Sequence, residues 1–302
     1  MTPIAGALLF LSAITHAGWN LISKRDHPTL AFYLVANTIG VLCVLPILFF
    51  YWPDIQKVPM SVWHCVNISG LFLAAYMAAL AAAYRKGDIS TAYPIARSLP
   101  VVFVTAATMY LGLGKTVSFG FIIGVSFIVI GCILLQLKHL HEFKARKFGS
   151  LSSIFALGAA LFITGYTIVD HEALALLRNL ERSPFKPLDA TLLYMILEAI
   201  SCSVWKGIFV MTRERERHAV KEVLTCYKVS AAITGIGIYL TYALVLLSMN
   251  FVTNVSYVAA FRQLSILLGA LFGIVILKES CFIPKIAGLG CIFAGLILVT
   301  VA

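Results

Sequence analysis

The feature of this sequence that most constrains its fold is a series of apolar runs that recurs along all 302 residues. Each run is long enough for a helix to cross a bilayer, which takes about 20 apolar residues. The runs carry no polar stripe at the helical period, although a helix on the surface of a water-soluble protein needs one. The chain is 61% hydrophobic and 12% charged, so it has about half the charged fraction of a soluble domain. These properties predict an all-α integral membrane protein.

The apolar runs predict about ten membrane-spanning helices, and their lengths exclude a transmembrane β-barrel, whose strands alternate polar and apolar residues over about ten positions. Most connections between the runs are short, and the two longest cover 171–188 and 212–228. The first run follows Met1 without a basic segment and is too long for a signal peptide, so we expect it to be retained. The predicted spans are 2–22, 29–51, 61–83, 89–111, 117–137, 150–170, 189–211, 229–248, 252–277 and 282–301.

The net charge of +10 is distributed as expected for a membrane protein, not for a nucleic-acid-binding one. Sixteen of the 23 basic residues fall in the odd-numbered connections when Lys206, near a predicted span end, is counted there; five fall in the even-numbered ones. Cytoplasmic loops carry the excess of Lys and Arg, so the odd-numbered connections are predicted to be cytoplasmic and both termini external. Anionic headgroups account for such residues without a nucleic-acid partner. The seven cysteines show no metal-ligand spacing, and no metal or cofactor is expected.

Short segments recur in order along the two halves of the chain. Gly18-Trp19-Asn20 aligns with Gly165-Tyr166-Thr167, and Ala96-Arg97-Ser98-Leu99 aligns with Phe261-Arg262-Gln263-Leu264. Similarly, Gly124 and Gly131 align with Gly288 and Gly295.

The repeated segments predict two five-helix repeats, residues 1–149 and 150–302. Because five is odd, the second repeat must be inverted in the membrane relative to the first. Inverted repeats are typical of secondary transporters, whose substrate site lies near the membrane midplane between the halves. The alternative is a duplication that only enlarges a structural bundle.

The sequence resembles the EamA branch of the drug/metabolite transporter superfamily. The resemblance rests on the ten-helix layout and on Gly18-Trp19-Asn20, Tyr93-Pro94-Ile95-Ala96-Arg97 and Leu277-Lys278-Glu279. It implies alternating access around a cavity lined by the first, third, fourth, sixth, eighth and ninth helices. One departure is Lys115, which stands in the first half where Glu279 stands in the second.

Arg97 and Arg262 lie inside predicted spans, where a charge costs several kcal/mol unless it faces protein or water. Arginine does not lose its charge in proteins, so each guanidinium needs a partner. Two guanidinium groups on one cavity would suit a carboxylate, phosphate or phosphonate. The alternative is pairing with internal acids, of which Glu198 and Asp170 are the candidates, or with helix-end carbonyls.

The helix around Arg97 places Ser90, Tyr93 and Arg97 on one face, at i, i+3 and i+7. Pro94 and Pro100 are expected to interrupt this helix and to free carbonyls that must be satisfied in a bundle or cavity. Prolines are also frequent in ordinary membrane helices.

Further polar residues lie at repeat-related positions near the first and sixth spans. Trp19 and Asn20, with Tyr166 and Thr167, could close the cavity and orient a ligand, although interhelical hydrogen bonding would explain them as well. Gln263 adjoins Arg262.

Two residues inside the predicted spans could carry a proton. His16 and Glu198 are the candidates for proton coupling, the alternative for the histidine being a hydrogen-bonded core residue.

These features predict a secondary transporter of a small anionic organic metabolite. Its expected location is the plasma membrane, which in a bacterium is the inner membrane. It would be no enzyme, since no nucleophile–base pair, metal spacing or phosphate loop is visible. Its expected partners are the substrate, the bilayer, and protons or a counter-substrate. The alternatives are an exporter of cationic drugs or amino acids, which would depend on Glu198, and an intramembrane lipid-handling protein.

Overall fold

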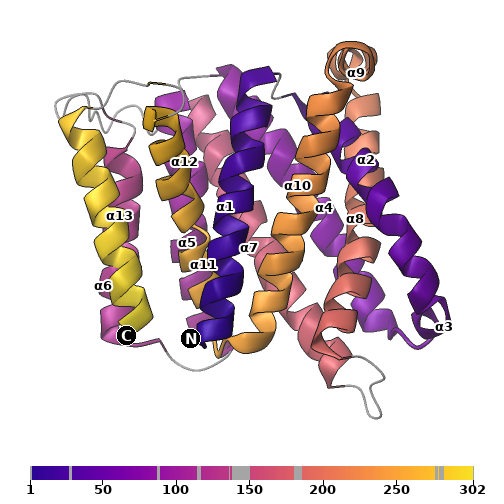
Figure 1. Ribbon diagram of the computed structural model, residues 1–302, viewed down its shortest axis with the longest axis horizontal. Coiled ribbons are helices and arrows are strands. Elements are labelled where there is room, and N and C mark those ends of the chain that lie inside the picture. Colours follow the sequence, from indigo (N-terminus) through magenta and orange to yellow (C-terminus); the bar gives the residue numbers. More distant parts are fainter. Residues whose placement is uncertain are drawn as a thin grey trace.

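The computed structural model describes residues 2–26, 29–86, 89–113, 117–135, 137, 150–179, 186–275, 278 and 282–301, with side chains except at 23–26, 84–86, 89–95 and 273. In these ranges the chain is helical, without a strand (Figure 1). The α-helices are α1 (Pro3–Asp26), α2 (Leu30–Leu48), α3 (Trp52–Ile55), α4 (Met60–Lys86), α5 (Ile89–Leu111), α6 (Phe119–Leu134), α7 (Leu151–Arg178), α8 (Pro187–Met211), α9 (Glu214–Cys226), α10 (Lys228–Ser248), α11 (Val255–Phe261), α12 (Leu264–Val275) and α13 (Ile283–Val301). Two 3₁₀ turns, η1 (Phe49–Tyr51) and η4 (Met249–Phe251), extend α2 and α10.

The helices have the length and composition of a multi-pass membrane protein. Eight segments within the described residues are long and apolar enough to span a bilayer, and the shorter apolar helices 96–111 and 119–134 lie beside them. Large apolar side chains such as Leu42, Ile130 and Phe293 are about half exposed or more, as expected where lipid is the solvent. The all-helical membrane architecture is therefore confirmed, while the number of ten crossings stays a prediction.

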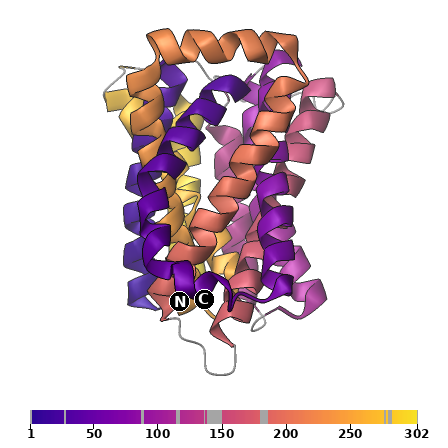
Figure 2. The same cartoon turned by 90° about the vertical axis from the view of Figure 1, so that its right-hand side faces the viewer.

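The two termini lie at the same end of the bundle, and α9 lies across the opposite end (Figures 1 and 2). Helix α9 was not predicted, because residues 212–228 are charged and were interpreted as a connection. The helix is held by its less polar face: Val223 is buried and packs with Phe32 of α2. The Glu216 carboxylate also accepts a hydrogen bond from the Ala31 backbone N–H at 3.0 Å, at the start of α2, where the helix has unpaired N–H groups.

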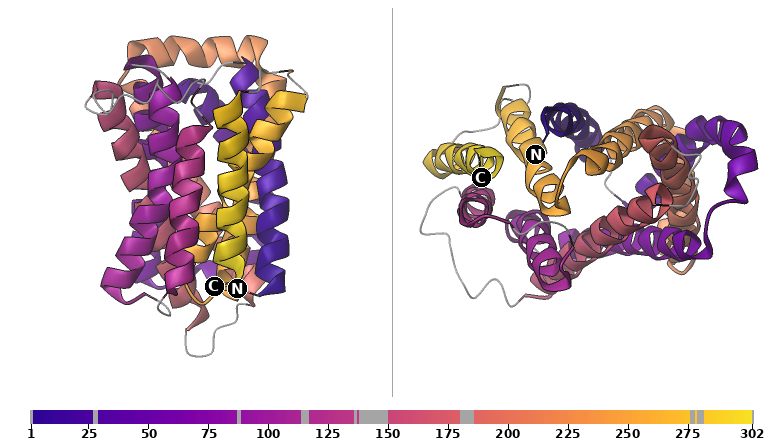
Figure 3. Two further views of the ribbon diagram at one scale, coloured as in Figure 1. Left: turned by 90° about the vertical axis from the view of Figure 1, so that its left-hand side faces the viewer. Right: turned by 90° about the horizontal axis from the view of Figure 1, so that it is seen from below.

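Helices from the two halves pack against each other in matching pairs. Helix α4 runs along α7 and α1 runs along α10; α4 also contacts α8, as α2 contacts α10. Helices α6 and α13 pack side by side at one edge of the bundle (Figure 3). Their backbones touch at glycines, since a Cβ on Gly131 would lie 2.6 Å from the Gly288 carbonyl oxygen and one on Gly295 would lie 2.6 Å from that of Gly124. The two contacts follow opposite sequence directions, so α6 and α13 are antiparallel.

One predicted boundary and one predicted helix interruption are wrong. Helix α7 continues to Arg178, eight residues past the predicted end of the sixth span, because Leu174 and Leu177 bury their side chains in the core. Helix α5 is unbroken from Ile89 to Leu111 and passes through both prolines, against the predicted interruption. A proline removes one helical hydrogen bond, and packing against neighbouring helices can maintain the helix in a membrane protein.

The break in the helices lies instead in the predicted ninth span. Helix α11 ends at Phe261, α12 begins at Leu264, and Arg262 and Gln263 form the turn between them. One of the two arginines predicted to bind substrate therefore stands at a helix break.

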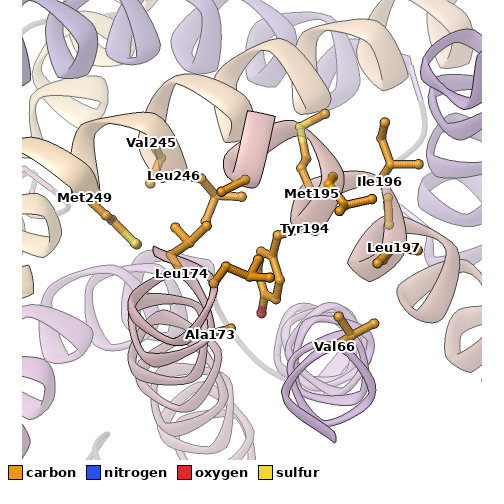
Figure 4. Close-up of a cluster of buried hydrophobic side chains, with 14 of the residues drawn as sticks. Val66, Ala173, Leu174, Tyr194, Met195, Ile196, Leu197, Val245, Leu246 and Met249 are labelled. Carbon is orange, nitrogen blue, oxygen red and sulfur yellow. The ribbon is translucent and has the colours of Figure 1, made fainter. Parts of the chain in front are cut away.

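The largest apolar cluster surrounds Tyr194 of α8 (Figure 4). Leu174 from α7, Leu246 and Met249 from the α10 end, and Val66 from α4 contribute to it. Tyr194 has no exposed surface, so its hydroxyl group needs a partner inside the protein. That partner belongs to the site described next.

Candidate functional site

A cavity of about 110 Å³ lies inside the bundle, lined by residues from both halves of the chain. All six helices that the family resemblance implied contribute to its wall, through α1, α4, α5, α7, α10 and the α11–α12 segment. Two further helices contribute: α2 through Asn37, and α8 through Glu198, Cys202 and Lys206.

The turn between α11 and α12 positions Arg262 at the cavity and compensates for the helical hydrogen bonds it loses. Ser265 Oγ donates to the Arg262 carbonyl oxygen at 2.7 Å, and Gln263 Nε2 donates to the Ala259 carbonyl oxygen at 3.2 Å. Carbonyls at a helix break need such partners where water is scarce. The side chains of Ser265 and Gln263 thus stabilise the turn.

The Arg262 guanidinium group contacts α7 through neutral groups. Its Nη2 donates to the Tyr166 hydroxyl at 2.7 Å, and its Nη1 lies 3.5 Å from Thr167 Oγ1. Its Cζ atom lies 5.5 Å from the centre of the Tyr166 ring, within the range of a cation–π contact. These contacts orient the guanidinium without neutralising its charge.

Ser265 connects the two arginines. Arg97 Nη2 on α5 donates to Ser265 Oγ at 3.2 Å, and the same hydroxyl donates to the Arg262 carbonyl oxygen. Both arginine side chains line the cavity. The predicted convergence of the repeat-related arginines on one cavity therefore has a direct structural connection.

His16 and Asn20 of α1 form a local hydrogen-bonded unit. Asn20 Nδ2 lies 2.7 Å from His16 Nδ1 and donates to the His16 carbonyl oxygen at 2.9 Å. The Trp19 ring stacks edge-on against His16 with the ring centres 4.7 Å apart. Because an amide nitrogen is a donor, His16 Nδ1 acts as the acceptor, which is the arrangement of a neutral imidazole.

An acidic pair lies at the wall of the cavity. Asp170 of α7 and Glu198 of α8 are both fully buried, and both contact the Ser69 hydroxyl of α4, at 2.5 and 2.8 Å. Asp170 also accepts hydrogen bonds from the hydroxyl groups of Tyr194 at 2.9 Å and Tyr242 at 2.5 Å. Of the two acids, Glu198 lines the cavity.

Within the described part of the chain, neither Asp170 nor Glu198 forms an ion pair, taken as N to O within 4.0 Å, with Arg97 or Arg262. The alternative that the internal acids pair with the arginines is thus not what the structure contains.

Lys206 is a cavity residue that the sequence interpretation missed. It was counted with the cytoplasmic connection, but its side chain is 3% exposed and its Nζ donates to Asn37 Oδ1 at 3.0 Å. Glu198, Cys202 and Lys206 are spaced at i, i+4 and i+8, so they share one face of α8. That spacing, ending in a lysine inside the predicted span, is the pattern that could have identified it.

Eight of the predicted site residues line the cavity: His16, Trp19, Arg97, Tyr166, Thr167, Glu198, Arg262 and Gln263. Asn20 is absent from the cavity wall and bonds to His16. The side chains of Ser90 and Tyr93 lie outside the described residues, as do Glu279 and Lys115. Within the described ranges no group of three His, Cys, Asp or Glu side chains could hold a metal ion.

Comparisons with known proteins agree with this architecture. No curated protein matches the sequence significantly. One crystal structure, described only as that of a protein, aligns with a TM-score of 0.66 over 98% of this chain and 97% of that chain, at 14% identity. That likeness concerns the fold alone. Residues 4–137 match the model of the EamA-like transporter family, which confirms the resemblance inferred from the motifs. The match covers residues 4–137, so it is this part of the chain that has the sequence pattern of a membrane-transporter family.

Proposed function

We propose that the chain is a secondary transporter that moves a small, anionic organic metabolite across the membrane, and that it is not an enzyme. The observation that carries the proposal is the presence of Arg97 and Arg262 on one cavity, with Arg262 bonded to neutral hydroxyl groups. The described partners of the Arg262 guanidinium group are neutral hydroxyl groups, and a buried guanidinium group of this kind favours an anionic ligand. Arginine also offers two parallel donors to a carboxylate, phosphate or phosphonate.

The size of the cavity favours a small substrate. Its volume of about 110 Å³ is well below the roughly 300–1,000 Å³ of pockets for drug-sized ligands. Tyr76, Tyr166 and Trp19 supply apolar surface around the arginines, suited to the carbon part of a metabolite. Export of bulky cationic drugs is therefore the weaker alternative, although Glu198 on the same cavity keeps a cationic or amino-acid substrate testable.

We further propose alternating access between two inverted halves, residues 1–149 and 150–302. The matching helix pairs α4–α7 and α1–α10 support this division, because exchanging the halves converts one pair into the other. The glycine contacts of α6 and α13 support it as well: the sequence repeat aligns Gly124 with Gly288 and Gly131 with Gly295, so the exchange converts each contact into the other. The family match also ends at residue 137, close to the proposed boundary.

The proposed location is the plasma membrane, which in a bacterium is the inner membrane. Helix α9, which carries Arg215, Arg217 and Lys221, lies at the end of the bundle opposite the termini, and Lys and Arg are in excess on the cytoplasmic side. This supports external termini. The orientation is tested by fusing to the C-terminus a fluorescent protein that does not fluoresce when it is exported to the periplasm. Fluorescence of the fusion would place the C-terminus in the cytoplasm and contradict the proposed orientation.

The experiment that tests the substrate class is thermal stability of the detergent-purified protein against phosphorylated, phosphonate, carboxylate, amino-acid, cationic and lipid-headgroup compounds. A ligand at about 100 times its dissociation constant adds about 2.7 kcal/mol to the stability. We expect stabilisation by an anion, lost in Arg97→Gln and Arg262→Gln and retained in the matched control Arg215→Gln, whose side chain is exposed on α9.

Stabilisation by cations alone, unchanged in both arginine variants, would contradict the anionic substrate and favour the alternative centred on Glu198. Stabilisation by lipid headgroups alone would favour the lipid-handling alternative.

A further inference from the structure

Two carboxyl groups, those of Asp170 and Glu198, contact the single hydroxyl group of Ser69. The Ser69 hydroxyl has one proton, yet its oxygen lies within hydrogen-bond distance of both Asp170 Oδ1 and Glu198 Oε1. Two ionised carboxylates are acceptors only, so one of the two contacts would then have no proton in it. Each contact has a proton of its own only if one of the two carboxyl groups carries a proton and donates it to Ser69 Oγ.

The surroundings indicate which carboxyl group carries that proton. Asp170 accepts from the Tyr194 and Tyr242 hydroxyl groups in addition to Ser69, and three donors are what stabilise a buried carboxylate. Glu198 differs, because its second oxygen, Oε2, is buried without a hydrogen-bond partner in the described part of the chain. A negative charge on that oxygen would be uncompensated, which is costly in a protein interior. The balanced arrangement is a neutral Glu198 that donates to Ser69, which in turn donates to an ionised Asp170.

Other charged and titratable groups face this pair from each packed element. From α8 itself, Tyr194, Cys202 and Lys206 share its neighbourhood. From α10 come Tyr239 and Tyr242, and from α4 comes Cys65. Arg262 contributes from the helix break. Lys206 is the cation on the same helix face, and its Nζ donates to Asn37 Oδ1 instead of to Glu198. No ion pair with a described cation therefore removes the need for a proton on Glu198.

We propose that Glu198 is a proton-binding site of the transport cycle, loaded through the cavity that holds the anionic substrate. The inference rests on the proposed function for its link to transport, while the proton site itself rests on the contacts of Ser69, Asp170 and Glu198. Asp170 is the positioning residue. It stays ionised and accepts the Ser69 proton, so that Ser69 Oγ is free to accept the proton of Glu198. His16, the other candidate from the sequence, is already an acceptor for Asn20 at Nδ1 and is not assigned this role.

The link between the proton and the substrate has a definite sign. An anion in the cavity is repelled by an ionised Glu198 and not by a neutral one, so proton binding and anion binding favour each other. Such coupling is reciprocal. Anion affinity is therefore highest where Glu198 is protonated and falls as the pH rises and the proton is lost, which is the behaviour of a proton–anion symporter.

The proton site is tested without any ligand, by infrared spectroscopy of the purified protein at neutral pH. Exposed carboxyl groups are ionised there, so the C=O stretch of a protonated carboxyl group identifies a perturbed one. We expect this band in the wild type and in the matched control Glu222→Gln, whose side chain is exposed on α9, and its loss in Glu198→Gln. We expect Ser69→Ala to shift the band, since the proton loses its acceptor. No band in the wild type, or an unchanged band in Glu198→Gln, would overturn the proton site.

The link to transport is tested by the stabilisation that inorganic phosphate, methylphosphonate and acetate give at neutral and alkaline pH. The decisive probe is acetate, whose charge is the same at both pH values. The wild type and Glu222→Gln should lose about tenfold in acetate affinity between the two conditions, whereas acetate affinity in Glu198→Gln should not depend on pH. Equal pH dependence in Glu198→Gln would overturn the link. The two failures are distinguishable: the infrared band without any stabilising anion would contradict the proposed function and leave the proton site standing.

Discussion

The surroundings of Arg262 and those of Asp170 both hold a charge inside the membrane, but they leave different groups open for a ligand. On both sides a charge inside the membrane is held by neutral hydroxyl groups and not by an opposite charge. The Asp170 carboxylate has three hydroxyl donors and is not among the residues that line the cavity. The Arg262 guanidinium has Tyr166 and Thr167 as partners and lines the cavity.

The two charged groups differ in how many donor or acceptor sites remain available to a ligand. A guanidinium group has five donors, and the contacts with Tyr166 and Thr167 leave it donors for a ligand. The three hydroxyl donors of Asp170 satisfy most of its acceptor sites, and the remaining open oxygen on this side belongs to Glu198. The comparison teaches that pairing the acids with the arginines would have neutralised the cavity, whereas hydroxyl partners leave one side for an anion and the other for a proton.

The largest expected effect is on the folded state and follows from the acidic side. Asp170→Asn places an amide, with its two N–H donors, where three hydroxyl groups donate. Hydrogen bonds to a charged group contribute about 1.5–3 kcal/mol, so we expect the ligand-free protein to lose at least that much in its free energy of unfolding. Thermal or denaturant unfolding measures it, with Glu222→Gln as the control. An Asp170→Asn variant as stable as the wild type would show that the hydroxyl contacts of Asp170 do not stabilise the fold.

The next effect belongs to the arginine side and concerns the ligand. Arg262→Lys keeps the positive charge but loses the planar pair of donors, so we expect anion affinity to fall about tenfold, which corresponds to about 1.4 kcal/mol. Anion-dependent thermal stabilisation measures it. Full affinity in Arg262→Lys would mean that the site uses point charge alone, and the comparison between the two sides would then rest on charge and not on geometry.

The smallest effect is expected at Ser265, which touches both arginines. Ser265→Ala removes the acceptor for Arg97 and the donor to the Arg262 carbonyl oxygen. Each such bond contributes about 0.5–1.5 kcal/mol, and water from the cavity can replace part of it. We expect a loss of about 1 kcal/mol in unfolding free energy and a weaker anion response, both measured by thermal shift. The control is Ser230→Ala, because Ser230 is a half-buried serine near the start of α10 and is not among the residues that line the cavity.

Much of the fold could be predicted because a membrane makes strict demands on sequence. A spanning helix must be apolar over its whole length, so its place is visible without knowledge of its neighbours. The arginines stood out for the same reason, since a charge in such a run is costly. The helix α9 was missed because its few apolar residues, such as Val223, gain their burial from α2 and not from lipid.

The interior of the cavity could be predicted only in part. Arg97 and Arg262 were found through the repeat, and Glu198 as an isolated acid in a span. Ser69 and Tyr242 were not found, because a single hydroxyl group in an apolar helix has no pattern in the sequence. The same holds for the helix break at Arg262, which contains neither proline nor glycine, while the two prolines of α5 lie in an unbroken helix.

The sequence by itself determined the membrane as solvent, the apolar helices and the match of residues 4–137 to a transporter family. These follow from local composition and short motifs, which do not depend on the packing of distant segments. Only the tertiary structure decided that Lys206 faces the cavity and that Ser69, Asp170, Glu198 and Tyr242 meet, because they come from four helices, α4, α7, α8 and α10. Which hydroxyl group lies beside which carboxyl group depends on how those helices pack, and packing joins residues that are more than 100 positions apart, such as Ser69 and Asp170.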